Sequence, residues 1–132
     1  MKRILFLCSD NSVLSPMAHA LARLYADEGT LTYSAGLRGA ERFEYRLPPM
    51  LGELGLEPRL PAPQSLAEHA DLGFDCCVLL GPAELRAPGL NVDVHWVLPE
   101  PAGLDDAAYR HLRDRLAERV RTLMNLFETE LD

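Results

Sequence analysis

The chain has 132 residues, of which 48% are hydrophobic and 25% charged, and these values are ordinary for one globular domain spanning residues 1–132. Its formal net charge of −7 argues against nucleic acid as a partner, because a phosphate backbone is bound by clustered Lys and Arg. No stretch approaches about 18 consecutive apolar residues, so neither a membrane span nor a membrane partner is expected.

Apolar runs and breakers in the first third of the chain predict two strands with a helix between them. Residues 3–7 are mostly apolar, as in a strand that is buried on both faces. Ser15 and Pro16 are typical of an N-cap and a first helical residue, and the helix is expected to run on to a C-cap glycine at Gly29. A second strand is expected at 31–35.

The remaining elements continue this alternation. A polar, Arg-rich loop is expected at 37–46, a short helix at 48–54 that ends at Gly55, and an extended proline-rich linker at 56–64. A short helix at 65–70 and strands at 74–80 and 92–97 are expected to follow. Asp105 or Asp106 caps a long final helix, which presents one apolar stripe: Tyr109, Leu112, Leu116, Val120, Leu123 and Phe127.

The predicted order is therefore β-α-β-α-β-α-β-α. Such alternation is typical of an α/β three-layer sandwich, and we expect a four-stranded parallel sheet, in the order 2-1-3-4, with helices on both faces. Ligands of such sheets bind beyond the carboxyl ends of the strands. The first strand ends at Cys8, so the loop that follows Cys8 is the candidate ligand site.

The three cysteines do not suggest disulfides. Cys8 stands alone, and Cys76 and Cys77 are adjacent on a predicted buried strand, which is a poor disulfide framework. Reduced thiols and a cytoplasmic location are expected. The four histidines show no ligand spacing, so no metal site and no cofactor are expected.

A cysteine that ends a strand shortly before the start of a helix can act as a nucleophile beside an anion-binding loop. Backbone N–H groups of such a loop converge on one point, and the helix N-terminus adds about half a positive charge there. That field would lower the pKa of the Cys8 thiol and create a nucleophile and an anion cradle together. The cradle is the candidate anion-binding loop: Ser9, Asp10, Asn11, Ser12, Val13 and Leu14. From the cysteine alone, a small buried hydrophobe is the commoner role.

The string Cys8-Ser9-Asp10-Asn11-Ser12-Val13-Leu14-Ser15-Pro16-Met17-Ala18 resembles the phosphate loop of the low-molecular-weight tyrosine phosphatases and thioredoxin-type arsenate reductases, whose pattern is Cys-x-x-Asn-x-x-Arg-Ser. The resemblance covers nearly the whole chain and implies the fold of that family. Further matches are Ser34-Ala35-Gly36, Phe74-Asp75, His95-Trp96 and the general-acid loop Pro99-Glu100-Pro101-Ala102. This last loop is nearer to the arsenate reductase branch.

The resemblance implies three catalytic residues. Cys8 matches the nucleophile, the Ser15 hydroxyl would hydrogen-bond its thiolate, and Glu100 falls at the general acid, which is aspartate in the family. Asn11 matches the residue that holds the loop in shape. A plain helix N-cap explains Ser15 equally well.

The main departure is Leu14, which stands where the family has the arginine that grips two phosphate oxygens. Leucine has no donor, and Asp10 adds negative charge to a loop meant for an anion. One of Arg38, Arg42 and Arg46 is able to replace the guanidinium if its loop lies at the rim, although a solvated loop is the favoured interpretation.

The arsenate branch carries two further redox cysteines, which by position fall at Gly81 and about Ala87, so the relay is missing. Cys76 and Cys77 would point to opposite faces of their strand, and packing is the favoured role for both.

Three functions follow from this pattern. The first is a weak or inactive pseudo-phosphatase that retains the loop and binds a phosphate-type anion or a protein partner. The second is an active phosphomonoester or phosphotyrosine hydrolase that forms a Cys8 phosphoenzyme. The third is an arsenate reductase-like thiol redox protein that relies on an external thiol. Leu14 opposes the second and the missing relay opposes the third.

Overall fold

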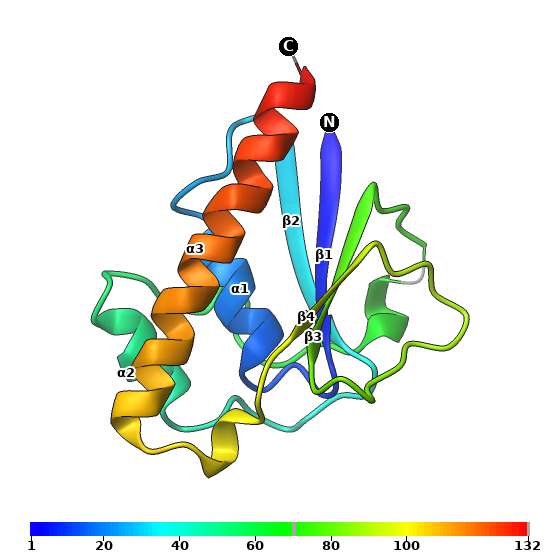
Figure 1. Cartoon of the computed structure of the whole chain (residues 1–132). Coiled ribbons are helices and arrows are strands. Elements are labelled where there is room, and N and C mark those ends of the chain that lie inside the picture. Colours follow the sequence, from blue (N-terminus) through cyan, green and yellow to red (C-terminus); the bar gives the residue numbers. More distant parts are fainter. Residues whose placement is uncertain (70, 132) are drawn as a thin grey trace.

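The computed structural model of the chain describes residues 1–69 and 71–131. A parallel four-stranded sheet lies at its centre, with helices on one face and a thinner cover of loops on the other (Figure 1). The elements follow in the order β1 (Lys2–Cys8), α1 (Leu14–Ala22), β2 (Thr30–Gly36), α2 (Leu47–Gly52), η1 (Leu66–His69), β3 (Cys76–Gly81), β4 (Val94–Val97), η2 (Pro101–Gly103) and α3 (Asp106–Leu131).

The sheet has the predicted order, β2-β1-β3-β4, and all three pairings are parallel. Cys8 lies opposite Gly36 of β2, and Leu7 lies opposite Leu79 of β3. The carboxyl ends of the strands therefore meet at one edge of the sheet, and Cys8 stands at the centre of that edge.

The larger core lies between the sheet and helices α1, α2 and α3. The predicted stripe of α3 is confirmed, since all six of its side chains are buried, and Met124 joins them. The helix begins as expected, because the Asp105 carboxylate accepts a hydrogen bond from the Ala108 N–H at 2.8 Å. Such a cap stabilises a helix by about 1 kcal/mol. Among the described residues, no helix combines the length and the apolar character that crossing a membrane requires.

The second face of the sheet differs from the prediction. Its smaller core is covered by η1 and by the segment 82–93, where we expected a helix between the third and fourth strands and find only turns. Gly81-Pro82 and Pro88-Gly89 explain the difference, because both pairs interrupt a helix. The third strand begins at Cys76 rather than at residue 74, and the fourth begins at Val94 rather than at residue 92.

Helix α1 is shorter than expected. It ends at Ala22, and Gly29 is not its cap; instead the Asp27 carboxylate accepts hydrogen bonds from the Gly29 N–H and the Thr30 hydroxyl and so forms the turn into β2. Gly55 does close the second helix region, whose regular part spans Leu47–Gly52. Its φ of +74° is one that glycine adopts freely.

The expected short helix at 65–70 is observed as the single 3-10 turn η1, Leu66–His69. The last residue of that prediction, Ala70, lies outside the described residues.

Candidate functional site

A pocket of about 140 Å³ opens at the carboxyl edge of the sheet, directly over Cys8. The loop after β1 forms its floor, and the segment after β4 forms one wall. The pocket brings together most of the residues that the sequence suggested, including Cys8 and Glu100. It is lined by Cys8, Ser9, Asp10, Ser12, Val13, Leu14, Glu44, Leu80, Glu100, Pro101 and Ala102.

Gly36 explains why the loop can lie where it does. A Cβ atom at Gly36 would stand 2.4 Å from the carbonyl carbon of Asp10 and 2.6 Å from its Cα, so no other residue fits without moving the loop. The N–H groups of Leu37 and Arg38 then donate to the carbonyls of Cys8 and Ser9, at 2.9 and 3.0 Å. The end of β2 therefore holds the base of the Cys8 loop from the side.

Asn11 holds the loop from beneath. It is fully buried and has a φ of +61°, a left-handed conformation that asparagine tolerates better than most residues. Its amide donates to the Ser15 Oγ at 2.7 Å, and its Oδ1 accepts the N–H of Gln64 at 2.8 Å. One side chain thus ties the loop to α1 and to the proline-rich segment.

Ser15 is not the N-cap that the sequence indicated. Helix α1 begins at Leu14, Val13 is its N-cap, and Ser15 lies buried inside the first turn. Its Oγ instead stands 2.9 Å from the Cys8 sulfur and donates to the Ala35 carbonyl at 3.2 Å. The hydroxyl has a single proton, so while that proton is directed to Ala35, the Cys8 S–H is the donor toward Ser15.

The protonation of Cys8 also differs from expectation. The side chain is almost fully buried, and burial raises the pKa of its thiol instead of lowering it. The Ser15 hydroxyl and the backbone N–H groups of Ser15, Asn11 and Asp10 favour the thiolate, but they do not outweigh desolvation. The cradle of donors is present, yet desolvation prevails and favours the thiol over the thiolate.

The charge around the pocket is negative. Asp10, Glu44 and Glu100 all line it, no Lys or Arg among the described residues does, and Leu14 contributes only apolar surface. The Asp10 carboxylate also accepts the Ser12 N–H at 3.0 Å and the Ser12 hydroxyl at 2.7 Å. One of the loop's backbone donors is therefore already engaged by an internal anion, and an entering anion would meet three carboxylates.

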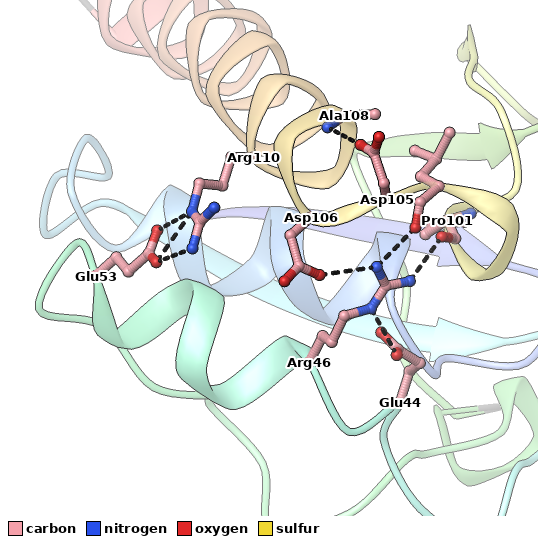
Figure 2. A network of polar contacts seen from close by, with 9 residues as sticks. Glu44, Arg46, Glu53, Pro101, Asp105, Asp106, Ala108 and Arg110 are labelled. Atoms are coloured by element: carbon pink, nitrogen blue, oxygen red, sulfur yellow. Dashed lines mark hydrogen bonds and ion pairs between the residues drawn. The ribbon is translucent and has the colours of Figure 1, made fainter.

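None of the three loop arginines replaces the missing guanidinium. Arg38 and Arg42 are exposed, and neither lines the pocket. Arg46 is buried rather than solvated, and it is fully engaged beside the pocket (Figure 2). It pairs with Glu44 at 3.1 Å and Asp106 at 3.3 Å, and it donates to the carbonyls of Pro101 and Leu104 at 3.1 and 2.7 Å.

Arg46 therefore joins the loop after β2 to the segment that follows Glu100. Its guanidinium also lies over the Tyr109 ring, 4.5 Å from the centroid. Glu44, its other partner, is the one pocket carboxylate that sequence reasoning missed, because it belongs to no motif and comes from a loop read as solvated. Burial, and then the Glu44 charge, raise the pKa of the Tyr109 phenol, which stays protonated.

Cys76 and Cys77 lie far from this chemistry. They are opposite Ile4 and Leu5 of β1, whereas Cys8 ends that strand. Three residues of strand correspond to about 10 Å, and a disulfide needs its two Cα atoms within about 7 Å. Burial raises the pKa of the Cys77 thiol to about 12. Within the described residues, no group of His, Cys, Asp or Glu side chains is arranged to hold a metal ion.

Comparison with known proteins gives a consistent result. No family model matches the sequence. An arsenate reductase of Halalkalibacterium halodurans is 29% identical over 131 residues, which cover 92% of this chain and 94% of the relative. The crystal structure of arsenate reductase from Archaeoglobus fulgidus superposes with a TM-score of 0.80 and 29% identity, over 92% of this chain and 98% of the other.

A phosphatase shares the fold as well. The YwlE arginine phosphatase from Geobacillus stearothermophilus superposes with a TM-score of 0.77 and 23% identity, over 98% of this chain and 95% of the other. The sheet order, the loop at Cys8 and these comparisons together show that the chain has the fold that the arsenate reductases and this phosphatase share, and that its sequence is similar to arsenate reductases over nearly its whole length.

Proposed function

We propose that this chain is a weak or inactive member of the family, which keeps the Cys8 loop and does not hydrolyse phosphomonoesters at ordinary enzyme rates. One observation carries the proposal. Among the described residues, three carboxylates and no cationic side chain line the pocket over Cys8, and burial raises the pKa of its thiol. Phosphoryl transfer depends mainly on positioning and on stabilisation of negative charge, so this pocket lacks the larger part of what the reaction needs.

The experiment is hydrolysis of an activated aryl phosphate by the wild-type chain and by Cys8→Ser. We expect wild-type activity near the background of the assay and no further loss in Cys8→Ser. The matched control is Cys76→Ser, which removes a thiol of the same chain outside the pocket. A wild-type rate in the ordinary enzyme range that Cys8→Ser abolishes, and that Cys76→Ser leaves unchanged, would refute the proposal.

The second candidate is an active phosphomonoester or phosphotyrosine hydrolase. It is favoured by the joint placement of Cys8 and Glu100 on one pocket, as a nucleophile and a general acid require. In that case Ser15 would turn its proton from Ala35 to the sulfur and stabilise the thiolate as it leaves. Glu100→Gln would then slow the hydrolysis of an alkyl phosphate more than that of an activated aryl phosphate, because the departing alcohol needs a proton more than an activated phenol does.

The third candidate is an arsenate reductase-like thiol protein, and the similarity to arsenate reductases favours it. The positions of the three cysteines oppose it, because Cys8 has no second thiol within disulfide reach. We therefore expect no arsenate reduction with thioredoxin as the only reductant. Turnover under those conditions would require an external thiol to resolve Cys8, and it would favour this function over the first.

A further inference from the structure

A groove distinct from the Cys8 pocket runs between the edge strand β4 and helix α3. It has a volume of about 480 Å³ and is walled by Val94 and Trp96 of β4 and by Leu123 and Leu126 of α3. A second hollow of about 340 Å³ continues it past the end of β4. Leu126 and Val97 are more than half exposed there, at 58% and 54%.

The edge of β4 also has free backbone groups. In the part of the chain that the structure describes, this strand is last in the sheet and pairs with β3 alone. The Leu98 N–H donates to Gly81 of β3, and residues of a strand direct their N–H and C=O groups alternately to its two sides, so Val94 and Trp96 bond β3 while His95 and Val97 direct theirs outward. An outward row of donors and acceptors is a template for another strand.

The charges of the groove are unpaired. Arg115 and Arg119 line both hollows, and within the described residues neither guanidinium has a carboxylate at ion-pair distance. Two other arginines of the same helix, Arg110 and Arg113, are paired with Glu53, and Arg113 also with Asp114. Glu118 lines the groove too, but it is exposed and forms no ion pair with either arginine.

We propose that this groove docks an extended, acidic segment of a protein partner, added as a strand to the edge of β4. The partner's backbone would bond His95 and Val97, and alternate apolar side chains would fill the hollow beside Trp96. Its carboxylates would pair with Arg115 and Arg119. A second copy of the chain fits less well, because two β4 edges paired about a twofold axis would bring these arginines toward their own counterparts.

The probe is a fluorescein-labelled peptide of alternating Val and Glu, measured by fluorescence anisotropy. We expect binding that weakens at least about tenfold between about 50 mM and about 300 mM salt, and amide NMR shifts confined to β4 and the facing half of α3. A peptide with Lys in place of Glu should not bind. The same acidic peptide, N-methylated at every second residue, should bind at least tenfold more weakly because it cannot donate to a strand.

The decisive variant is R115E/R119E, with R3E/R23E as a control of the same charge change on exposed arginines outside the groove. We expect the first to abolish binding and the second to leave it within about twofold, with both variants folded by circular dichroism. The proposal is overturned by equal loss in both variants, by equal binding of the N-methylated peptide, by shifts at the Cys8 loop, or by no binding at all. Self-association through β4 in sedimentation would assign the face to a second copy instead.

Discussion

The Cys8 pocket and the groove between β4 and α3 differ in the sign of the charged side chains that they present: carboxylates line the pocket, and two arginines line the groove. The family resemblance implies that the pocket is an anion site. Burial nevertheless favours the protonated Cys8 sulfur, and carboxylates line the pocket walls. The guanidinium of the neighbouring Arg46 hydrogen-bonds other groups of the chain, among them the Pro101 carbonyl. In the groove, neither Arg115 nor Arg119 forms an ion pair with a described residue. Among the described residues, unpaired guanidinium groups therefore line the groove, and none lines the Cys8 pocket.

The largest expected effect comes from restoring the missing cation. Two charge-assisted hydrogen bonds from a guanidinium contribute about 1.5–3 kcal/mol each, or about 3–6 kcal/mol together. That corresponds to about two to four powers of ten in rate. Leu14→Arg should therefore raise aryl phosphatase activity, and Asp10→Gly with Leu14→Arg should raise it further, since it removes the carboxylate that engages Ser12. Steady-state kinetics on both variants measures the effect.

The gain should vanish when Cys8→Ser is added to either variant. Leu14→Lys is a useful comparison, because it supplies the charge without the planar fork and should recover less. If Leu14→Arg folds, binds inorganic phosphate and still gains no activity, the loop is built for another ligand. The missing cation would then not explain the difference between the pocket and the groove.

Arginines of the two regions should differ in their contribution to folding. Arg46→Met leaves the buried Pro101 carbonyl, the partly buried Leu104 carbonyl and the Glu44 carboxylate without this donor, so the melting temperature should fall by about 5 °C or more. Arg119→Met removes a guanidinium with no ion pair and should change it by about 1 °C or less. Thermal unfolding followed by circular dichroism tests both; similar shifts would mean that the groove arginine is also structural.

His19 of α1 is a second buried group whose charged form is disfavoured by burial. It is buried, its Nδ1 stands 3.1 Å from the Ser34 hydroxyl, and burial, with the Arg59 charge, lowers its pKa to about 4 from 6.5. Between these two values the unfolded chain binds a proton that the folded chain does not. The free energy of unfolding should therefore fall as pH falls from about 6.5 to about 4, by up to about 3 kcal/mol.

Denaturant titrations across that pH range measure the change, and His19→Gln removes the titrating group. The variant should lose most of the pH dependence in this window, whatever its stability at pH 7. A variant that keeps the full slope would show that the slope arises from other groups and that His19 tolerates protonation in the fold.

The smallest expected effect concerns thiol reactivity. Cys8 lines an open pocket and neither of the other cysteines does, so it should be the first to be alkylated at neutral pH. The reaction should still be slower than that of a free cysteine, since burial raises the pKa of the thiol. Leu14→Arg should accelerate it about tenfold. Peptide mapping after iodoacetamide gives the rates, and faster modification of Cys76 or Cys77 would contradict the assignment.

Several features of the fold were predictable because they depend on local pattern. The four strands, their parallel order and the buried stripe of α3 follow from apolar periods and breakers, and all are observed. Element ends were less accurate. Gly29 resembled a helix cap, but the Asp27 side chain forms the turn there, and the Gly-Pro pairs of 81–89 exclude the helix expected between β3 and β4.

Some features of the candidate site were likewise predictable from the sequence, and others were not. The sequence by itself determined which loop carries Cys8, that Leu14 offers it no donor, and that Glu100 belongs to a matching segment. Only the tertiary structure decided that Glu44 lines the pocket and that Arg46 donates its hydrogen bonds to carbonyls 55 and 58 residues away. It also decided that burial favours the protonated Cys8 thiol. Those outcomes depend on burial and on partners distant in sequence, and desolvation is set by all the neighbours of a group together, which no local motif specifies.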